Sequence, residues 1–152
     1  KNMMSEPIIE LRELDKSNYR DILKLKVADN QTGFVASNAV SLAQALFHPQ
    51  AWYRGIYHGD TAVGFVMLEL DMEKPEYYLW RYMIDEKFQG HGYGYEALEL
   101  VIEHVKSLPK SVEFLLSYVP KDGNPKGFYE KLGFIDTGEM EEGELIMKLE
   151  FK

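Results

Sequence analysis

The stretch that decides the fold is residues 77–94, YYLWRYMIDEKFQGHGYG, together with the helical pattern that follows it. Residues 77–84 are apolar and aromatic, as in a buried strand, and apolar side chains then recur at helical spacing over residues 97–105. Between them, Gly90, Gly92 and Gly94 fall within five positions. Such glycines let the backbone pass close to a ligand and point several N–H groups one way, while the helix adds its positive dipole end. The stretch therefore predicts a strand, a phosphate-binding turn and a helix.

The spacing of these glycines excludes the two best-known phosphate-binding turns. No Lys-Ser or Lys-Thr pair follows them, so nothing would reach a terminal phosphate or hold magnesium as a P-loop does. The dinucleotide fingerprint is absent as well, because positions 95 and 97 carry no glycine. A turn without a ligand is the alternative for this hexamer alone. Its place between a strand and a helix favours the phosphate-binding interpretation.

Composition limits the kind of protein. The chain has 152 residues, 45% of them hydrophobic and 28% charged, which predicts one folded domain over residues 4–152. Residues 1–3 precede Met4, a natural start, and are expected to be a cloning remnant. The net charge of −8 argues against nucleic acid or an anionic membrane as partner and favours a cationic substrate. Without cysteine, disulfides, zinc–thiolate sites and thiol nucleophiles are excluded.

Targeting and metal-binding signals are also lacking in the sequence. No apolar run approaches the roughly 20 residues that span a bilayer, and no basic segment precedes a hydrophobic one near the N-terminus. We therefore expect a cytoplasmic protein. The histidines, His48, His58, His91 and His104, show no ligand spacing, so we expect no metal site.

Hydrophobic periodicity gives the element order βααβββαβαββ. Strands are predicted at residues 8–14, 52–57, 62–70, 77–84, 112–119, 134–137 and 144–151, and helices at residues 18–27, at about 38–47, after the glycine turn, and at 126–132. Gly133 stands where a helix commonly ends.

The glycine turn and this element order resemble the GNAT superfamily of N-acetyltransferases, whose pyrophosphate loop is Arg/Gln-x-x-Gly-x-Gly/Ala. Residues 128–134, FYEKLGF, resemble the second hallmark of the superfamily. The resemblance implies an α/β (α+β) fold, with a mixed central sheet of about seven strands flanked by four helices. It also implies acetyl-CoA as cosubstrate, bound at the turn by Gln89, Gly90, His91, Gly92, Tyr93 and Gly94.

The resemblance further implies roles along the rest of the cosubstrate. The matching tyrosine, Tyr129, protonates the leaving thiolate, which suits a phenol that is neutral at pH 7. Backbone groups of Met83 and Ile84 bind the pantetheine, and one N–H polarises the thioester carbonyl. The family asparagine seven residues before the tyrosine is replaced by Asp122, so we take Asn124, five before it, as the candidate contact.

The acceptor amine needs a base, because an alkylamine with a pKa of about 10.4 is neutral in only about one molecule in a few thousand at pH 7. Where family members often keep a glutamate, this chain has Trp80, which cannot serve. The candidates are Glu69, Asp71, or Tyr82 acting through water. We favour Glu69, although a solvent-facing residue is the common fate of such a glutamate.

Two acidic runs bear on the substrate: Glu69, Asp71, Glu73 and Glu76, and Glu139, Glu141, Glu142 and Glu144. Such runs are usually solvated faces, but if they converge they attract a polycation. The aromatic residues Trp52, Tyr78, Trp80 and Tyr82 offer cation–π contacts to ammonium groups. We predict an acceptor site formed by Glu69, Asp71, Trp80 and Tyr82.

Residues 31–45, 79–85 and 127–139 resemble the bacillus-type spermine/spermidine (diamine) N-acetyltransferases. This similarity implies a polyamine substrate, with direct attack of the amine in a ternary complex. Acetylation of another amine, in an aminoglycoside-like drug or a protein, is one alternative, and a non-catalytic acyl-CoA-binding module is another. The superfamily resemblance also implies a homodimer.

Overall fold

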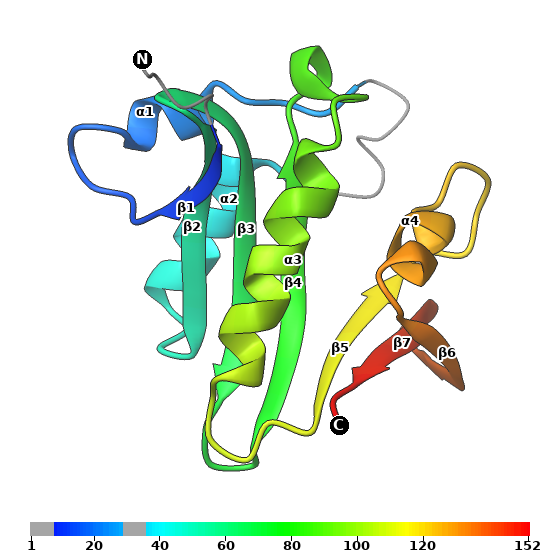
Figure 1. Cartoon of the computed structure of the whole chain (residues 1–152). Coiled ribbons are helices and arrows are strands. Elements are labelled where there is room, and N and C mark those ends of the chain that lie inside the picture. Colours follow the sequence, from blue (N-terminus) through cyan, green and yellow to red (C-terminus); the bar gives the residue numbers. More distant parts are fainter. Residues whose placement is uncertain (1–7, 29–35) are drawn as a thin grey trace, which may run out of the picture.

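The computed structural model describes residues 8–28 and 36–152, which form one mixed sheet with helices on both faces (Figure 1). The sheet contains seven strands in the order β1-β2-β3-β4-β5-β7-β6. Within the described ranges, the strands are β1 (Ile9–Arg12), β2 (Ala51–His58), β3 (Thr61–Asp71), β4 (Glu76–Ile84), β5 (Glu113–Tyr118), β6 (Ile135–Glu141) and β7 (Glu144–Glu150). The helices are α1 (Tyr19–Leu23), α2 (Asn38–Leu46), α3 (Tyr93–Lys106) and α4 (Lys126–Lys131), with a short 3-10 helix, η2 (Glu86–Phe88).

The predicted fold class and element order are confirmed, with strand and helix ends mostly within a few residues of the prediction. The predicted helix over residues 18–27 is the main difference, since α1 ends at Leu23. Lys26 instead donates its N–H to Asp85 Oδ2 and accepts from the N–H of Glu86, each at 2.9 Å. These bonds to the segment after β4 replace the helical bonds that the backbone of Lys26 would otherwise make. Residues 1–3 and the segment 29–35, which carries part of the subfamily resemblance, lie outside the described residues.

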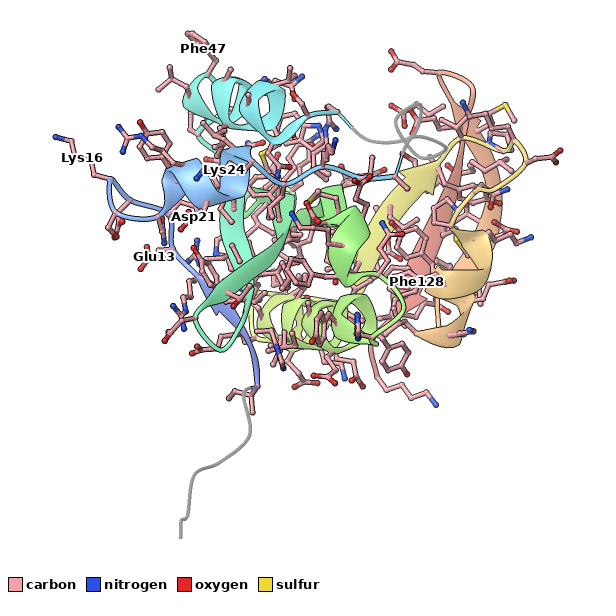
Figure 2. All side chains as sticks on the ribbon, turned by 90° about the horizontal axis from the view of Figure 1, so that it is seen from above. Glu13, Lys16, Asp21, Lys24, Phe47 and Phe128 are labelled. Atoms are coloured by element: carbon pink, nitrogen blue, oxygen red, sulfur yellow. The ribbon has the colours of Figure 1, made fainter. Side chains whose placement is uncertain are left out.

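Each face of the sheet has its own core, because alternate residues of every strand point to opposite sides. On one face, α3 buries Ala97, Leu98 and Val101 against a cluster that extends from β1 to β7. On the other face, α1 and α2 cover a smaller cluster around Phe65 and Met67. Figure 2, viewed from above, shows α1 and α2 on one side of the sheet and α3 on the other. Among the described helices, none is long and apolar enough to cross a membrane.

The sheet opens between β4 and β5, the strands that join its two halves. Tyr78 and Leu115 are the one pair in parallel register across this junction in the described chain. Figure 1 shows β5 leaning away from β4, and carrying β7, β6 and α4 with it. The separation leaves strand edges inside the molecule to which an extended ligand can bind.

A β-bulge in β4 changes the direction of its side chains. The register with β3 steps from Leu68–Leu79 to Met67–Arg81, so Trp80 is an extra residue. Arg81 donates to Gln44 Oε1 of α2 at 3.0 Å, and the Trp80 ring lies edge-on to His48, with centroids 5.1 Å apart. Both side chains therefore point to the α2 face. Tyr82 returns to the α3 face, where it packs against the larger core.

Candidate active site

A cavity of about 1580 Å³ lies between β4 and β5 and is lined from both faces of the sheet. It collects most of the predicted site residues: Glu69, Trp80, Tyr82, Met83, Ile84, Gln89, Gly90, Gly92, Tyr93, Gly94, Asn124 and Tyr129. Asp71 and His91 are not in its lining. Asp71 instead accepts from the N–H groups of Glu73 and Lys74, each at 3.1 Å, and so fixes the turn before β4.

The glycine turn has the geometry of an anion cradle. Gly90 and Gly92 have φ of +84° and +80°, a backbone conformation that favours glycine, and a Cβ at either would meet nothing within 4 Å. Gly92 caps α3, whose first helical bond runs from the N–H of Glu96 to the carbonyl of Gly92 at 3.1 Å. The N–H groups of the first turn, at residues 93–95, therefore have no helical acceptor. They line the cavity at the positive end of a helix of 14 residues.

Gly94 differs from Gly90 and Gly92, because its φ is not in the left-handed region. The reason for a glycine at this position is the close packing around it. A Cβ there would lie 3.3 Å from Ile84 Cγ1 and 3.7 Å from Phe128 Cζ. The Tyr82 hydroxyl donates to the Gly94 carbonyl, and Gln89 Nε2 donates to the Ile84 carbonyl at 3.0 Å. The side chains of Tyr82 and Gln89 thus hold the turn against the end of β4.

Sequence reasoning missed Asp85, which organises the start of this turn. It is 1% exposed, and its carboxylate accepts from the N–H groups of Lys87 and Lys26, each at 2.9 Å. The signal was present in the sequence, because an aspartate just after a strand is a typical cap of the helical turn that follows.

Tyr129 brings an unpaired phenol to the cavity from α4. The side chain is only 9% exposed, and burial raises the pKa of its hydroxyl, with no hydrogen bond contributing from the described residues. Burial, and secondarily the nearby Tyr129, also raise the pKa of Tyr82 well above its ordinary value. Phe128 of α4 (labelled in Figure 2) faces the other half of the molecule. Its ring is stacked on that of Tyr82, with centroids 6.4 Å apart. Tyr129 is therefore protonated at physiological pH and its hydroxyl has no hydrogen-bond partner among the described residues.

The two acidic runs converge on the same cavity. Its lining includes Glu69, Glu76, Glu139, Glu141, Glu142 and Glu144, whereas Asp71 and Glu73 lie outside it. Tyr78 lies among them: burial raises the pKa of its hydroxyl, and the charges of Glu76, Glu141, Glu139 and Glu69 raise it further. Arg81 and Lys131 are the basic residues of the lining within the described chain. This end of the cavity therefore favours a cationic ligand.

Asn124 also lines the cavity, but its amide is already bonded within its own loop. Its Oδ1 accepts from the N–H of Lys126, and its Nδ2 donates to the Lys121 carbonyl, each at 2.9 Å. Asp122, which takes the family asparagine's place in the sequence, is not in the lining. In the described part of the chain, no group of three or more histidine, aspartate or glutamate side chains is arranged to hold a metal ion.

A cavity with an anion cradle at one end and carboxylates at the other suits transfer of an acyl group from a phosphate-bearing donor to a cationic acceptor. The acetyltransferase (GNAT) family matches residues 10–134, so the chain belongs to this family. It is an N-acetyltransferase that uses acetyl-CoA.

Individual relatives agree with this assignment. Spermine/spermidine N(1)-acetyltransferase of Bacillus subtilis (strain 168) is 30% identical over 148 residues, which cover 91% of this chain and 96% of that protein. The crystal structure of an acetyltransferase from Thermus thermophilus aligns with a TM-score of 0.74 at 14% identity, covering 97% of this chain and 100% of that one. The PaiA N-acetyltransferase of Thermoplasma acidophilum, in complex with coenzyme A, gives 0.68 at 15% identity, covering 95% and 99%. At these identities the two structures show a shared fold.

Proposed function

We propose that the protein acetylates a primary amine of a polyamine such as spermidine or spermine, by direct attack in a ternary complex. The observation that carries the proposal is the convergence of six glutamates on the cavity that also contains the glycine turn and Tyr129. A polyamine carries several positive charges and no negative one, which matches this acidic end. The Bacillus subtilis relative, named for spermine and spermidine, supports the same substrate class.

The residues present fit acetyl-CoA, which supplies an acetyl thioester. Gly90 and Gly92 leave open space where side chains would stand, and the free N–H groups at residues 93–95 suit a pyrophosphate. We assign pyrophosphate binding to residues 89–94, with His91 contributing its backbone only. Beyond Tyr78, β4 pairs with no other strand of the described residues on the side of β5, so an extended pantetheine can pair there, next to Met83 and Ile84 of the cavity lining.

We assign Tyr129 as the general acid that donates a proton to the leaving sulfur. The amine nitrogen bonds to the carbonyl carbon and loses a second proton to solvent, the carbon–sulfur bond breaks, the thiolate receives the hydroxyl proton of Tyr129, and the Tyr129 phenolate is reprotonated from solvent. The raised pKa keeps Tyr129 protonated at physiological pH, so its hydroxyl has a proton to donate. Tyr82 is a weaker candidate for proton transfer, because its hydroxyl already donates to Gly94.

We assign Glu69 as the base that removes a proton from the acceptor ammonium group. It lies on β3 opposite Tyr78 and lines the cavity, whereas Asp71 is engaged in the turn. Trp80 lines the same end of the cavity and offers a ring face to the acceptor chain.

An acetylation assay over a substrate panel tests the proposal. Purified protein is given acetyl-CoA with spermidine, spermine, an aminoglycoside or a lysine-bearing peptide, and CoA release is followed. We expect spermidine and spermine to give the highest kcat/KM. Turnover of the drug or peptide alone would assign another amine, and CoA binding without any transfer would indicate a binding module.

A further inference from the structure

Tyr78 lies where the opening between β4 and β5 closes. It forms the pair with Leu115 that joins the two strands, and it faces Glu69 of β3 on its other side. Its neighbours Tyr77 and Leu79 are buried in the core on the α3 face. Because side chains alternate along a strand, Tyr78 projects to the α2 face, where it lines the acidic end of the cavity.

Carboxylates from separate strands line the same cavity as Tyr78. Glu69 comes from β3 and Glu76 from β4, while Glu139 and Glu141 come from β6, and all four raise the pKa of the phenol after burial. Glu144 of β7 is fixed nearby on β5 by a 2.9 Å hydrogen bond from Ser117 Oγ. A neutral phenol among carboxylates can donate its proton to one of them and accept from an ammonium group, which also contacts the ring face.

The position of the reacting nitrogen is fixed by a different part of the cavity. Tyr129 lines the cavity close to Tyr82. Its side chain is about nine-tenths buried, and its hydroxyl has no hydrogen-bond partner among the described residues. Tyr82 lies four positions after Tyr78 on β4, a separation of about 13 Å for a regular strand, which the bulge at Trp80 shortens. Tyr82 and Tyr78 point to opposite faces of the sheet, but both line the same cavity as Tyr129, so a chain-like acceptor that reacts near Tyr129 can extend through the opening between β4 and β5 to Tyr78.

We propose that Tyr78, with Glu76, Glu139 and Glu141, binds the distal ammonium group of the acceptor, and that it thereby determines the preference for a polyamine over a monoamine. This inference rests on the proposed function. Its consequence is that the enzyme recognises a second positive charge at a set distance from the reacting amine. Lengthening a diamine one methylene at a time then improves KM until the distal group reaches Tyr78.

The test compares spermidine with butylamine, whose reactive end is the same but which lacks the distal charges. Steady-state rates are measured at saturating acetyl-CoA for the unmodified protein, Tyr78→Phe and Glu141→Gln. We expect Tyr78→Phe to raise the KM of spermidine about tenfold more than that of butylamine, as for a lost hydrogen bond to a charged group. Glu141→Gln should do the same to a smaller extent. Tyr53→Phe and Glu99→Gln, whose side chains lie outside the cavity lining, serve as matched controls.

The outcomes separate this inference from the proposed function. If the unmodified protein prefers spermidine and both variants keep that preference, Tyr78 is not the anchor, although the polyamine function stands. An equal loss for both amines would assign Tyr78 a structural role and overturn the inference. If spermidine is not a substrate at all, the proposed function fails and this inference fails with it. Should Tyr78→Phe not fold, as judged by its melting curve, Glu141→Gln on the exposed hairpin decides the question.

Discussion

The two ends of the cavity are built in different ways. The cradle end uses backbone N–H groups of one continuous stretch, from Gln89 to Tyr95, placed by a strand end and a helix start. The acidic end uses side chains from β3, β4, β6 and β7, which meet only because the sheet brings them together. Backbone groups suit the pyrophosphate of the cosubstrate, which is the same for every acceptor. At the acidic end, changing one side chain can change which acceptor is preferred. Four experiments exploit this difference.

The largest effect is expected from Tyr129→Phe, at the boundary between the two ends. Removing the proton donor should lower kcat by about 100-fold or more, because general acid catalysis contributes that much. The affinity for CoA should stay within about threefold, since the phenyl ring remains. Stopped-time assays and calorimetric titration with CoA measure the two quantities.

Tyr118→Phe is the matched control, because Tyr118 also lines the cavity but its hydroxyl donates to Asp136 Oδ1 at 3.3 Å. The pH profile adds a second check. Because the pKa of Tyr129 is raised, its proton is present below that value and lost only above it. The unmodified enzyme should therefore keep its activity through about pH 10, where an ordinary tyrosine ionises. A fall in kcat near pH 10 that is absent from Tyr129→Phe would show that the Tyr129 proton is needed but would contradict the raised pKa, whereas an equal fall in both enzymes would assign the titration to another group.

Gly92→Ala should act on the cradle alone. Alanine at a φ of +80° costs about 1–2 kcal/mol of backbone strain, and its methyl group would enter the space that faces the ligand. We expect the Kd for CoA to rise about tenfold or more, with a smaller change in kcat at saturating acetyl-CoA. Gly138→Ala has the same strain, at a φ of +83°, outside the cavity lining. If both variants bind CoA equally weakly, strain and not the cradle explains the loss.

Raising the salt concentration should weaken binding of the polyamine at the acidic end but not binding of CoA at the cradle end. Raising ionic strength from about 0.01 to 0.1 M shortens the screening length from about 30 to 10 Å, so the KM of a polyamine should rise several-fold. The affinity for CoA should not weaken, because the net charge of −8 repels a polyphosphate and salt screens that repulsion. Equal weakening of both ligands would mean that the glutamates do not attract the acceptor.

Asn124→Ala should give the smallest effect on binding. Its amide oxygen accepts from the N–H of Lys126 at the start of α4, so losing this hydrogen bond should cost about 1 kcal/mol of stability, or about 2–4 °C in Tm. The Kd for CoA should change by less than about threefold. A tenfold or greater loss of CoA affinity, with Tm unchanged, would instead identify Asn124 as a direct contact.

The sequence correctly predicted the strand, the glycine turn and the helix at the cradle end, because their signals are local. Gly90, Gly92 and the helix that follows are contiguous, and their backbone needs are visible in the residue types themselves. The element order followed from periodicity for the same reason.

The acidic end was harder to predict because it depends on long-range register. Nothing local indicates that Glu139 and Glu141, on the edge strand β6, reach Tyr78, nor that Asp71 turns away from Glu69. The bulge at Trp80, which sends Trp80 and Arg81 to one face, likewise depends on pairing with β3. Asp85 could have been predicted in part. Its role as a cap follows from its place after a strand, but its hydrogen bond to Lys26, 59 residues away in the sequence, does not.

The single pair between β4 and β5 also bears on how the chain holds together. Strands β1 to β4 pair with one another, and so do β5 to β7. Between β4 and β5, which we call the seam, there is one residue pair in register among the described residues, so the two halves are held together mainly by the shared core on the α3 face. A ligand lying in the seam supplies main-chain partners that the polypeptide lacks. By linkage, a hundredfold excess over Kd adds about 2.7 kcal/mol to the free energy of unfolding. With acetyl-CoA bound as proposed, the cosubstrate completes the sheet between β4 and β5.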